Sequence, residues 1–493
     1  MADMKTYKYF VNNSWHEPSS GKFFDTENPA TGVTWARVPD CRSEDINGAV
    51  AAAKNAFYEG PWRKMMPAQR GRYLRNIGDV ISRNAERLGS IETLDNGKLP
   101  KQITPSLEKD AWSVDSWSYY AGMCDKFEGR IIPAEMPNLH NYLKWEPFGV
   151  VAQILPWNSP IGTLIWKLAP CIAAGNTVVL KPSEHASCST LELMDVLLEA
   201  DLPPGVLNVV TGFGQTTGEP LIDHKDVRMV SFTGGTIGGR TVASIAARKV
   251  KPIVMELGGK SPQIVFPDSD LDLAVNGIAS GIFPAGGQSC ISGSRLLIHK
   301  SIIDEFTERL VNRVKKARVG DPHDPQTQIG PMANRSHYES VLKKISAAEK
   351  MGFELVLDGR SACREAGYYI GPTIFANVPN DSDLAQNEVF GPVASTESWD
   401  NEDQVIDVAN DTIYGLAAGI WSGNVTKAMR IADQIEAGTV YINNYFNAAA
   451  QSPVGGYKQS GYGRENGWEG MRCFMQAKSV WLATDPHQEE PFS

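Results

Sequence analysis

One cysteine, Cys290, lies in a short run of glycine, serine and other small residues, PAGGQSCISGSR at 284–295. A free cysteine packs most often as a small buried hydrophobic residue. Its thiolate is also well suited to attack a carbonyl carbon and then to leave from a thioester. The local sequence therefore leaves three interpretations open: packing, metal ligation and nucleophilic catalysis.

Two polar residues that follow apolar strand-like runs have chemistry that a cysteine nucleophile would need. Asn158 in PWNSP either caps a turn or donates its amide to a developing oxyanion. Glu256 in MELGGKSP is either a plain strand-end carboxylate or a general base that activates water. A cysteine whose acyl intermediate must be hydrolysed requires such a base.

Two glycine-rich turns in the same part of the chain are candidate phosphate sites. GFGQTTG at 212–218 and GGTIGG at 234–239 each follow a strand-like run and open a helix, where free N–H groups and the helix dipole favour an anion. Neither matches the dinucleotide fingerprint G-x-G-x-x-G. Lys181 and Glu184 in LKPSE either begin a solvated helix or hold ribose hydroxyls, and an acidic residue there favours NAD over NADP.

Composition and charge exclude several classes of partner. The chain has 493 residues, 42% hydrophobic and 21% charged, which is ordinary for a globular protein of several domain-sized units. A net charge of -10 without a basic block argues against nucleic acid or an anionic membrane surface. No signal peptide or membrane span is evident. Seven scattered cysteines without CxxC or HxxxH motifs predict a reducing, cytoplasmic location and no local metal site.

The elements that must position these residues alternate between short apolar runs and helical stretches. From about residue 149, strand-like GVVAQIL, NTVVLK and VLNVV alternate with helical IGTLIWKLAPCIAAG and STLELMDVLLEADL. Such alternation predicts a parallel, doubly wound α/β sheet. A second alternation runs from SPQIVF to GTVYINN and predicts another α/β domain, reached through ELGGK.

Taken in order along the chain, these motifs resemble the aldehyde dehydrogenase superfamily over nearly the whole length. ELGGKSP at 256–262 precedes GQSCISGSR, which reads G-Q-x-C-x-x-x-x-R. NEVFGPV at 387–393, YGLAAGIW at 414–421 and SPVGGYKQSGYGREN at 452–466 follow in the same order. Because Glu256 is present, the resemblance is to the hydrolytic, NAD(P)-dependent type and not to the branch that passes the acyl group to coenzyme A.

The resemblance implies a fold of two doubly wound, Rossmann-like α/β domains with a small β oligomerisation arm. We expect a discontinuous NAD-binding domain at 1–127 and 147–258, and a catalytic domain at 259–474. The arm is expected at 128–146 and 475–493. Arms of this kind pair subunits, so a homodimer or homotetramer is expected.

The resemblance also implies a mechanism. Cys290 attacks an aldehyde to give a thiohemiacetal, whose oxyanion is held by the Asn158 amide and the Cys290 backbone N–H. Hydride transfer to NAD leaves a thioester, which water activated by Glu256 hydrolyses. Gln476 in CFMQAKSV stands where many hydrolytic members carry a second glutamate, so Glu256, aided by Lys167, is expected to suffice.

The cofactor site implied by the resemblance uses G-x-T-x-x-G in place of the usual fingerprint. Gly235 stands where members often have serine, so backbone N–H groups would replace one side-chain contact to phosphate. NAD is the expected cofactor, with NADP less favoured because of Glu184. The residues expected to bind it are Ile154, Pro156, Trp157, Asn158, Lys181, Ser183, Glu184, Gly214, Gly218, Phe232, Thr233, Gly234, Gly235, Thr236, Gly239, Glu256, Leu257, Gly258, Glu388 and Phe390.

The implied substrate tunnel has no charged residue, and several of its positions are small where related enzymes carry bulky aromatics. Its expected residues are Ser159, Gly162, Thr163, Trp166, Ile291, Tyr445, Phe446, Ala448, Ala449 and Val454. We therefore expect a roomy apolar pocket for aromatic, terpenoid or long aliphatic aldehydes. A semialdehyde or betaine-aldehyde dehydrogenase stays open as an alternative, as does a cysteine esterase or acyl transferase without a redox step.

Overall fold

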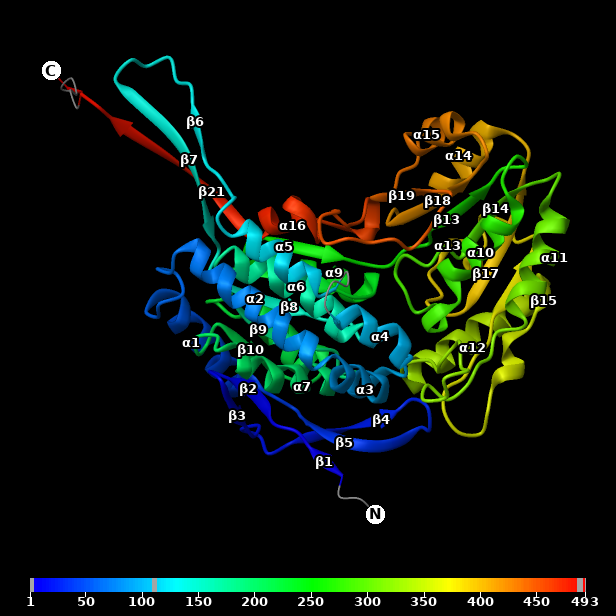
Figure 1. The fold of residues 1–493 in the computed structure, drawn as a ribbon, viewed down its shortest axis with the longest axis horizontal. Helices are drawn as coiled ribbons and strands as arrows, with labels where there is room; N and C mark the ends of the chain where they lie inside the picture. Colours follow the sequence, from blue (N-terminus) through cyan, green and yellow to red (C-terminus); the bar gives the residue numbers. More distant parts are fainter. Residues whose placement is uncertain (1–3, 109–112, 486–490, 493) are drawn as a thin grey trace.

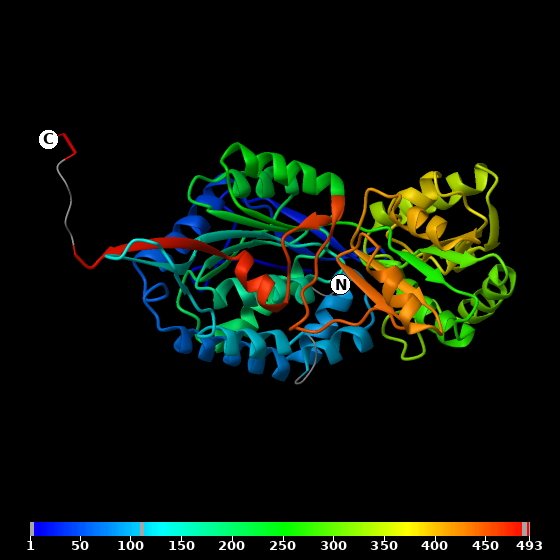
Figure 2. The same ribbon diagram turned by 90° about the horizontal axis from the view of Figure 1, so that it is seen from above.

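The structure, a computed structural model, describes the whole chain except residues 1–3, 109–112, 486–490 and 493. The parts of the expected NAD-binding domain and arm that fall on those positions lie outside the described residues. Two lobes lie side by side, and a long β arm projects from one of them (Figures 1 and 2). Within the described residues, no helix combines the length and apolar character that a bilayer crossing needs.

The larger sheet has eight strands, and its five central strands are parallel and mostly buried. Their spatial order is third, second, first, fourth, fifth in chain order, the order of a doubly wound dinucleotide fold, with a crevice at the carboxyl ends of the first and fourth. The prediction of a doubly wound α/β fold is confirmed. From edge to edge the strands are β20 (Gly461–Tyr462), β12 (Ile253–Glu256), β11 (Met229–Thr233), β8 (Val150–Ile154), β9 (Thr177–Lys181), β10 (Leu207–Val209), β2 (Tyr9–Val11) and β3 (Ser14–His16).

Helices cover both faces of this sheet, which explains its nearly continuous apolar strands. Val178 and Leu180 of β9 belong to one buried cluster, and Val179 belongs to the other. Helices α6 and α7, with α2, α3 and α5 packed on them, form the first layer, and α1, α8 and α9 form the second. The helices of this lobe are α1 (Ser43–Tyr58), α2 (Pro67–Arg83), α3 (Ala85–Asn96), α4 (Pro100–Leu107), α5 (Asp115–Met123), α6 (Pro160–Ala173), α7 (Cys188–Leu197), α8 (Glu219–Asp223) and α9 (Thr236–Arg248).

The second lobe is built on a seven-stranded sheet, parallel except for one edge strand. In spatial order its strands are β15 (Glu354–Leu357), β16 (Thr373–Ala376), β17 (Val393–Trp399), β14 (Arg295–His299), β13 (Pro262–Val265), β18 (Ala417–Trp421) and β19 (Thr439–Ile442). Its helices are α10 (Leu271–Ile282), α11 (Ile303–Val314), α12 (Arg335–Lys350), α13 (Asp383–Gln386), α14 (Glu402–Asn410) and α15 (Val425–Ala432). Helices α10 and α11 contribute to one buried cluster, and α14 and α15 to another.

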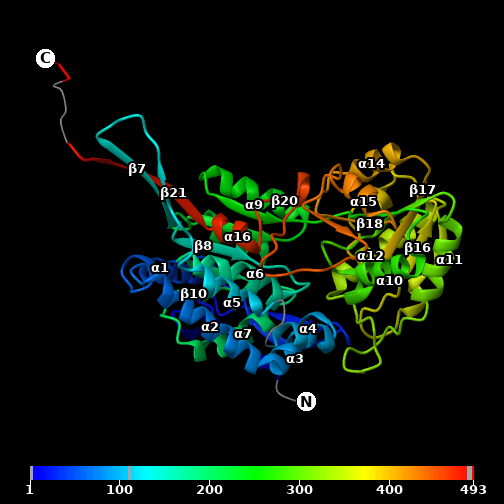
Figure 3. The same cartoon turned by 45° about the horizontal axis from the view of Figure 1, so that its top comes forward.

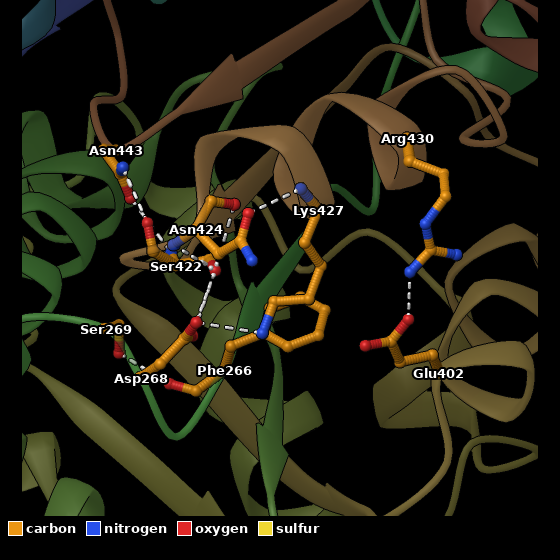
Figure 4. Close-up of polar contacts among 9 residues, drawn as sticks. All are labelled: Phe266, Asp268, Ser269, Glu402, Ser422, Asn424, Lys427, Arg430 and Asn443. Atoms are coloured by element: carbon orange, nitrogen blue, oxygen red, sulfur yellow. Dashed lines mark hydrogen bonds and ion pairs between the residues drawn. The ribbon is translucent and has the colours of Figure 1, made fainter.

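Side chains close the carboxyl ends of β13 and β18, the edge where an open α/β sheet commonly binds a ligand. Ser422 donates to the Asp268 carboxylate at 3.0 Å, and Lys427 Nζ lies 3.0 Å from the same group (Figure 4). Lys427 Nζ also lies 4.4 Å from the centre of the Phe266 ring. The cysteine turn and the GGK link enter the second sheet at its opposite, amino-terminal edge.

The arm is a three-stranded antiparallel sheet that extends away from the first lobe (Figure 3). Its strands are β21 (Met475–Ala483), β7 (Leu139–Pro147) and β6 (Arg130–Ile132). A further small sheet beside the N-terminus contains β1 (Lys5–Thr6), β5 (Val33–Pro39) and β4 (Phe23–Asn28).

One part of the expected catalytic range, 259–474, belongs structurally to the first lobe. Strand β20 pairs with β12, and α16 (Gly467–Cys473) contacts α6. The chain crosses back to the first lobe because it must reach the arm strand β21. This return brings the segment around Glu465 against the end of β12.

Candidate active site

A cavity of about 790 Å³ lies at the carboxyl ends of β8 and β11 and is lined by residues of both lobes. Cys290, Glu256 and Asn158 all line it. The cavity is where the strand order predicts a ligand crevice. Three chemically complementary residues from distant parts of the chain therefore share one space.

The cysteine turn is tightly packed, and this packing explains its glycines. Gly286 and Gly287 have φ angles of 65° and 68°, in the left-handed region that glycine tolerates best. A Cβ at Gly287 would lie 2.2 Å from the Gly391 carbonyl oxygen. A Cβ at Gly259 would lie 2.5 Å from the Cys290 carbonyl oxygen, so the ELGGK and GGQSC segments meet backbone to backbone.

The Asn158 side chain lies next to this turn. Its Nδ2 donates to the carbonyl of Gln288 at 2.9 Å. The Asn96 amide holds the main chain on either side, because it lies 3.3 Å from the carbonyl oxygens of both Trp157 and Asn158. The Asn158 amide is thus held against the cysteine turn, at a residue two positions before Cys290.

The Cys290 thiol is neutral near pH 7 in this structure. Burial first, and then the carboxylates of Glu388, Glu256 and Glu465, together raise its pKa to about 12. A neutral thiol is a poor nucleophile. If Cys290 is the nucleophile, its proton must leave Sγ when substrate and cofactor are in place.

Glu256 ends β12 with its carboxylate buried. Burial first, and then the charge of Glu465, raises its pKa well above the ordinary value, while Lys167 acts in the opposite direction. Its Oε1 makes no hydrogen bond to any residue that the structure describes. A buried carboxylate of raised pKa beside a thiol is what a general base for water activation requires.

Glu465 is a second carboxylate at the site that the sequence analysis did not identify. It lines the cavity and accepts from the buried Lys167 ammonium, which also lies 3.0 Å from Ser231 Oγ. Gln476 instead lies exposed on β21, with its Nε2 3.4 Å from the Pro147 carbonyl. The expectation that Gln476 marks the loss of a second glutamate is therefore wrong, because β21 leads out into the arm.

The residues expected to bind the cofactor divide into two groups. Those that line the cavity are Pro156, Trp157, Asn158, Thr233, Gly234, Gly235, Thr236, Glu256, Leu257, Gly258, Glu388 and Phe390. Those outside its lining are Ile154, Lys181, Ser183, Glu184, Gly214, Gly218, Phe232 and Gly239. Lys181 Nζ lies 3.1 Å from the Glu184 carboxylate, at the carboxyl end of β9.

Two glycines of the G-x-T-x-x-G turn have different structural roles. A Cβ at Gly239 would lie 2.5 Å from Leu257, so glycine permits α9 to pack closely on the sheet. A Cβ at Gly235 would meet open space, because this residue precedes α9 and faces the cavity. Glycine at position 235 thus leaves room at the N-terminus of α9.

Three of the expected substrate residues, Thr163, Trp166 and Val454, line the cavity. The cavity lining does not include Ser159, Gly162, Ile291, Tyr445, Phe446, Ala448 and Ala449. Tyr445 donates to the Ile291 carbonyl at 2.7 Å and so braces the cysteine turn. Phe446 is 46% exposed.

Residues of α12, of α13 and of the loop after α13 also line the cavity, although they were not among the predicted site residues. They are His337, Ser340, Lys344, Asp383, Asn387 and Val389. His337 and Lys344 lie seven positions apart, which places them on one face of a helix. Their spacing could have predicted a shared helix face, but nothing in the sequence shows which loop that face contacts.

Comparisons with known proteins agree with this geometry. A model of the aldehyde dehydrogenase family matches residues 15–480. The chain is 40% identical over 472 residues to an aldehyde dehydrogenase of Emericella nidulans, covering 96% of this chain and 94% of that protein. It is 39% identical over 491 residues to the (Z)-2-((N-methylformamido)methylene)-5-hydroxybutyrolactone dehydrogenase of Acinetobacter baylyi, covering 99% of both chains.

Among solved structures, betaine aldehyde dehydrogenase of Staphylococcus aureus in complex with NAD+ superposes with a TM-score of 0.96. The two chains are 36% identical, and the match covers 99% of this chain and 97% of that one. The resemblance drawn from the ordered motifs is thereby confirmed. This chain belongs to the aldehyde dehydrogenase family.

Proposed function

We propose that the protein oxidises an aldehyde to the carboxylic acid with NAD as hydride acceptor. The observation that carries this proposal is that Cys290, Asn158 and Glu256 line one cavity together with the glycine turn after β11. A cysteine esterase or acyl transferase would use the first three residues but would leave the turn and the Rossmann-like crevice without a role.

The crevice has features that suit a dinucleotide. The buried Thr233 Oγ1 makes no hydrogen bond to a described residue, and the α9 N-terminus with its free N–H groups follows directly. A Cβ at Gly258 would lie 2.4 Å from the Glu388 carboxylate, so this carboxylate is held close to the main chain. The S. aureus neighbour was solved with NAD+. When bound, the nicotinamide supplies the hydride acceptor.

In the proposed mechanism the protein side chains perform three tasks. Cys290 Sγ gives its proton to water and bonds to the aldehyde carbon as the C=O π electrons move to oxygen, and the Asn158 amide with the Cys290 N–H stabilises the resulting oxyanion. After oxidation, Glu256 takes a proton from water as the water oxygen bonds to the thioester carbon. The C–S bond then breaks and releases the acid. The Lys167–Glu465 pair lies next to Glu256 and sets the charge around it.

We propose a bulky apolar aldehyde as substrate, of aromatic, terpenoid or long aliphatic type. Thr163, Trp166 and Val454 give the cavity wall uncharged side chains. One cation beside the expected tunnel is Lys98, whose Nζ lies 3.4 Å from Ser159 Oγ. The buried Glu92 lies near that charge: burial raises the pKa of its carboxyl, and the Lys98 charge acts in the opposite direction. Family membership leaves the substrate open, because the relatives named above act on chemically different compounds.

A panel of aldehydes, assayed with NAD and NADP in parallel, tests the proposal. We expect NADH formation at 340 nm, with higher kcat/KM for benzaldehyde-like and long aliphatic aldehydes than for succinic semialdehyde, betaine aldehyde or acetaldehyde. NAD should be preferred over NADP, because Glu184 would repel a 2′-phosphate. Higher kcat/KM for succinic semialdehyde than for the benzaldehyde-like and long aliphatic aldehydes would refute the proposal of an apolar substrate. Absence of any reduced nucleotide would favour the esterase alternative.

We propose that the arm pairs two copies of the chain, as a homodimer or homotetramer. Strand β21 is an edge strand, and Trp481 and Leu482 on it are each 55% exposed. A long edge strand with exposed apolar side chains is normally covered by a partner. Light scattering should give a multiple of the chain mass, and Trp481→Glu should lower it. A wild-type monomer would refute this assembly.

We also propose a reducing compartment, the cytoplasm, as the location. All seven cysteines of the sequence lie in the described part of the chain, and all are free. Free cysteines persist where glutathione and thioredoxin keep thiols reduced.

A further inference from the structure

The loop that carries Glu388 and Phe390 is held from one face of α12. His337 Nε2 lies 2.7 Å from the Phe390 carbonyl oxygen. Two turns further along the helix, Lys344 Nζ donates to the Glu388 carbonyl oxygen. Residues seven apart on a helix share a face. One face of α12 therefore holds the main chain on both sides of Val389 through hydrogen bonds.

The same face is packed between these two polar contacts. Val341 lies between His337 and Lys344 on α12, and a Cβ at Gly391 would come within 2.9 Å of its side chain. The Gly391 carbonyl in turn lies against Gly287 of the cysteine turn. The loop at 388–391 is thus confined between α12 and the turn that carries the nucleophile.

The His337 ring is held by its place at the start of α12 and by two neighbouring aromatic rings. Asn334 caps α12, and its side chain accepts from the His337 backbone N–H at 2.9 Å. The ring centre lies 4.9 Å from that of Trp157 and 5.7 Å from that of Phe390, and the latter two rings lie 5.2 Å apart. Burial lowers the pKa of His337 to about 4, so the ring is neutral. Since a carbonyl only accepts, Nε2 carries the proton.

Phe390 needs this support because its backbone is strained. Its φ is 58°, in the left-handed region, which is sterically unfavourable for a bulky residue. Such a conformation persists only when surrounding contacts impose it. The His337 hydrogen bond acts on the carbonyl of this same residue, and the ring contact with Trp157 holds its side chain.

We infer that His337 and Lys344 are positioning residues for hydride transfer, which act by holding the Phe390 and Glu388 carbonyls so that the ring and the carboxylate keep their places in the cavity. This inference rests on the proposed function, in which Glu388 and Phe390 face the nicotinamide end of the cofactor. Neither His337 nor Lys344 need touch the reacting atoms.

Variants on both contacts test the inference. His337→Leu and Lys344→Met remove one donor each, and His337→Gln places an amide N–H at similar reach, whereas His337→Asn is one methylene shorter. We expect kcat for aldehyde oxidation to fall about tenfold to a hundredfold in the Leu, Met and Asn variants, because small misplacements of a reacting group have effects of that size. His337→Gln should recover most of the loss.

Two further readouts separate positioning from a general structural effect. With an aldehyde deuterated at the carbonyl carbon, the isotope effect on kcat should rise in the impaired variants, because hydride transfer becomes slower than the other steps. Alkylation of Cys290 by iodoacetamide should stay within about twofold of wild type. The exposed residues Lys343 and His323 supply matched controls as Lys343→Met and His323→Leu.

Each outcome has a distinct meaning. Wild-type kcat and isotope effect in His337→Leu and Lys344→Met would overturn the inference. So would a kcat loss matched by an equal change in Cys290 alkylation, or equal activity of the Gln and Asn variants. If the wild-type protein forms no NADH with any aldehyde, the proposed function itself fails. If His337→Leu does not fold, the Gln and Asn pair still decides.

Discussion

Replacement of Cys290 with alanine will lower aldehyde oxidation by about 10⁴-fold or more, while NADH binding stays intact. Loss of a catalytic nucleophile has effects of this order in enzymes that form acyl intermediates. Cys290 is the one cysteine among the residues that line the described cavity, so no neighbouring thiol replaces it. The cofactor crevice is built from β8, β11 and α9, which do not depend on the sulfur.

The measurement is NADH formation at 340 nm, combined with NADH binding followed by fluorescence. Cys363→Ala is the matched control, since Cys363 is a free, partly exposed cysteine outside the cavity lining. It should retain wild-type turnover. Turnover of Cys290→Ala within tenfold of wild type would show that another group is the nucleophile.

Glu256→Gln will form about one NADH per active site and then stall. Oxidation of the thiohemiacetal does not need the base, but hydrolysis of the thioester does. A general base contributes about 10²- to 10⁴-fold, so steady-state turnover should fall by that factor. A rapid-mixing experiment at 340 nm will show the burst, and mass spectrometry will show the acyl group on Cys290.

The raised pKa of Glu256 also predicts the direction in which turnover changes with pH. Burial and Glu465 raise the pKa of Glu256, so the basic form is gained as pH rises through that raised value. Turnover of the wild type should therefore increase with pH where hydrolysis is limiting, and Glu256→Gln should lose this increase. A variant that turns over steadily, with an unchanged pH profile, would exclude Glu256 as the base.

Glu465→Gln serves as the comparison variant. It leaves the buried Lys167 ammonium without its carboxylate, and breaking a buried pair costs about 3 to 5 kcal/mol. We expect a lower Tm together with slower hydrolysis. Lys167→Met combined with Glu465→Gln should recover Tm but not the rate. In Glu256→Gln, by contrast, the rate should fall with little change in Tm.

Several features of the fold could be predicted because each depends on short stretches of sequence. Apolar runs such as GVVAQIL predict buried parallel strands, and the structure has β8 there. The glycine turn at 234–239 follows β11 and opens α9 as expected. Cys290, Glu256 and Asn158 could be proposed because their motifs follow one another in a recognisable order, and the structure brings all three to one cavity.

Other features depend on which loops meet, and no local pattern carries that information. Glu465 was missed although its segment, SPVGGYKQSGYGREN, was recognised, because only the return of the chain to β12 places that carboxylate beside Lys167. The expected substrate residues Tyr445, Phe446, Ala448 and Ala449 come from the resemblance alone, and in the structure Tyr445 donates to the Ile291 carbonyl and so braces the cysteine turn.

The sequence by itself thus determined the class of fold, the nucleophile candidate and its two chemical partners, because strand periodicity, glycine turns and motif order are local properties. Tertiary structure decided the electrostatics and the support of the site. The pKa of Glu256 depends on a carboxylate more than two hundred positions away, and the strained Phe390 depends on a helix that precedes it by about fifty. Charge and backbone strain act through distance in space, which the order of residues along the chain does not encode.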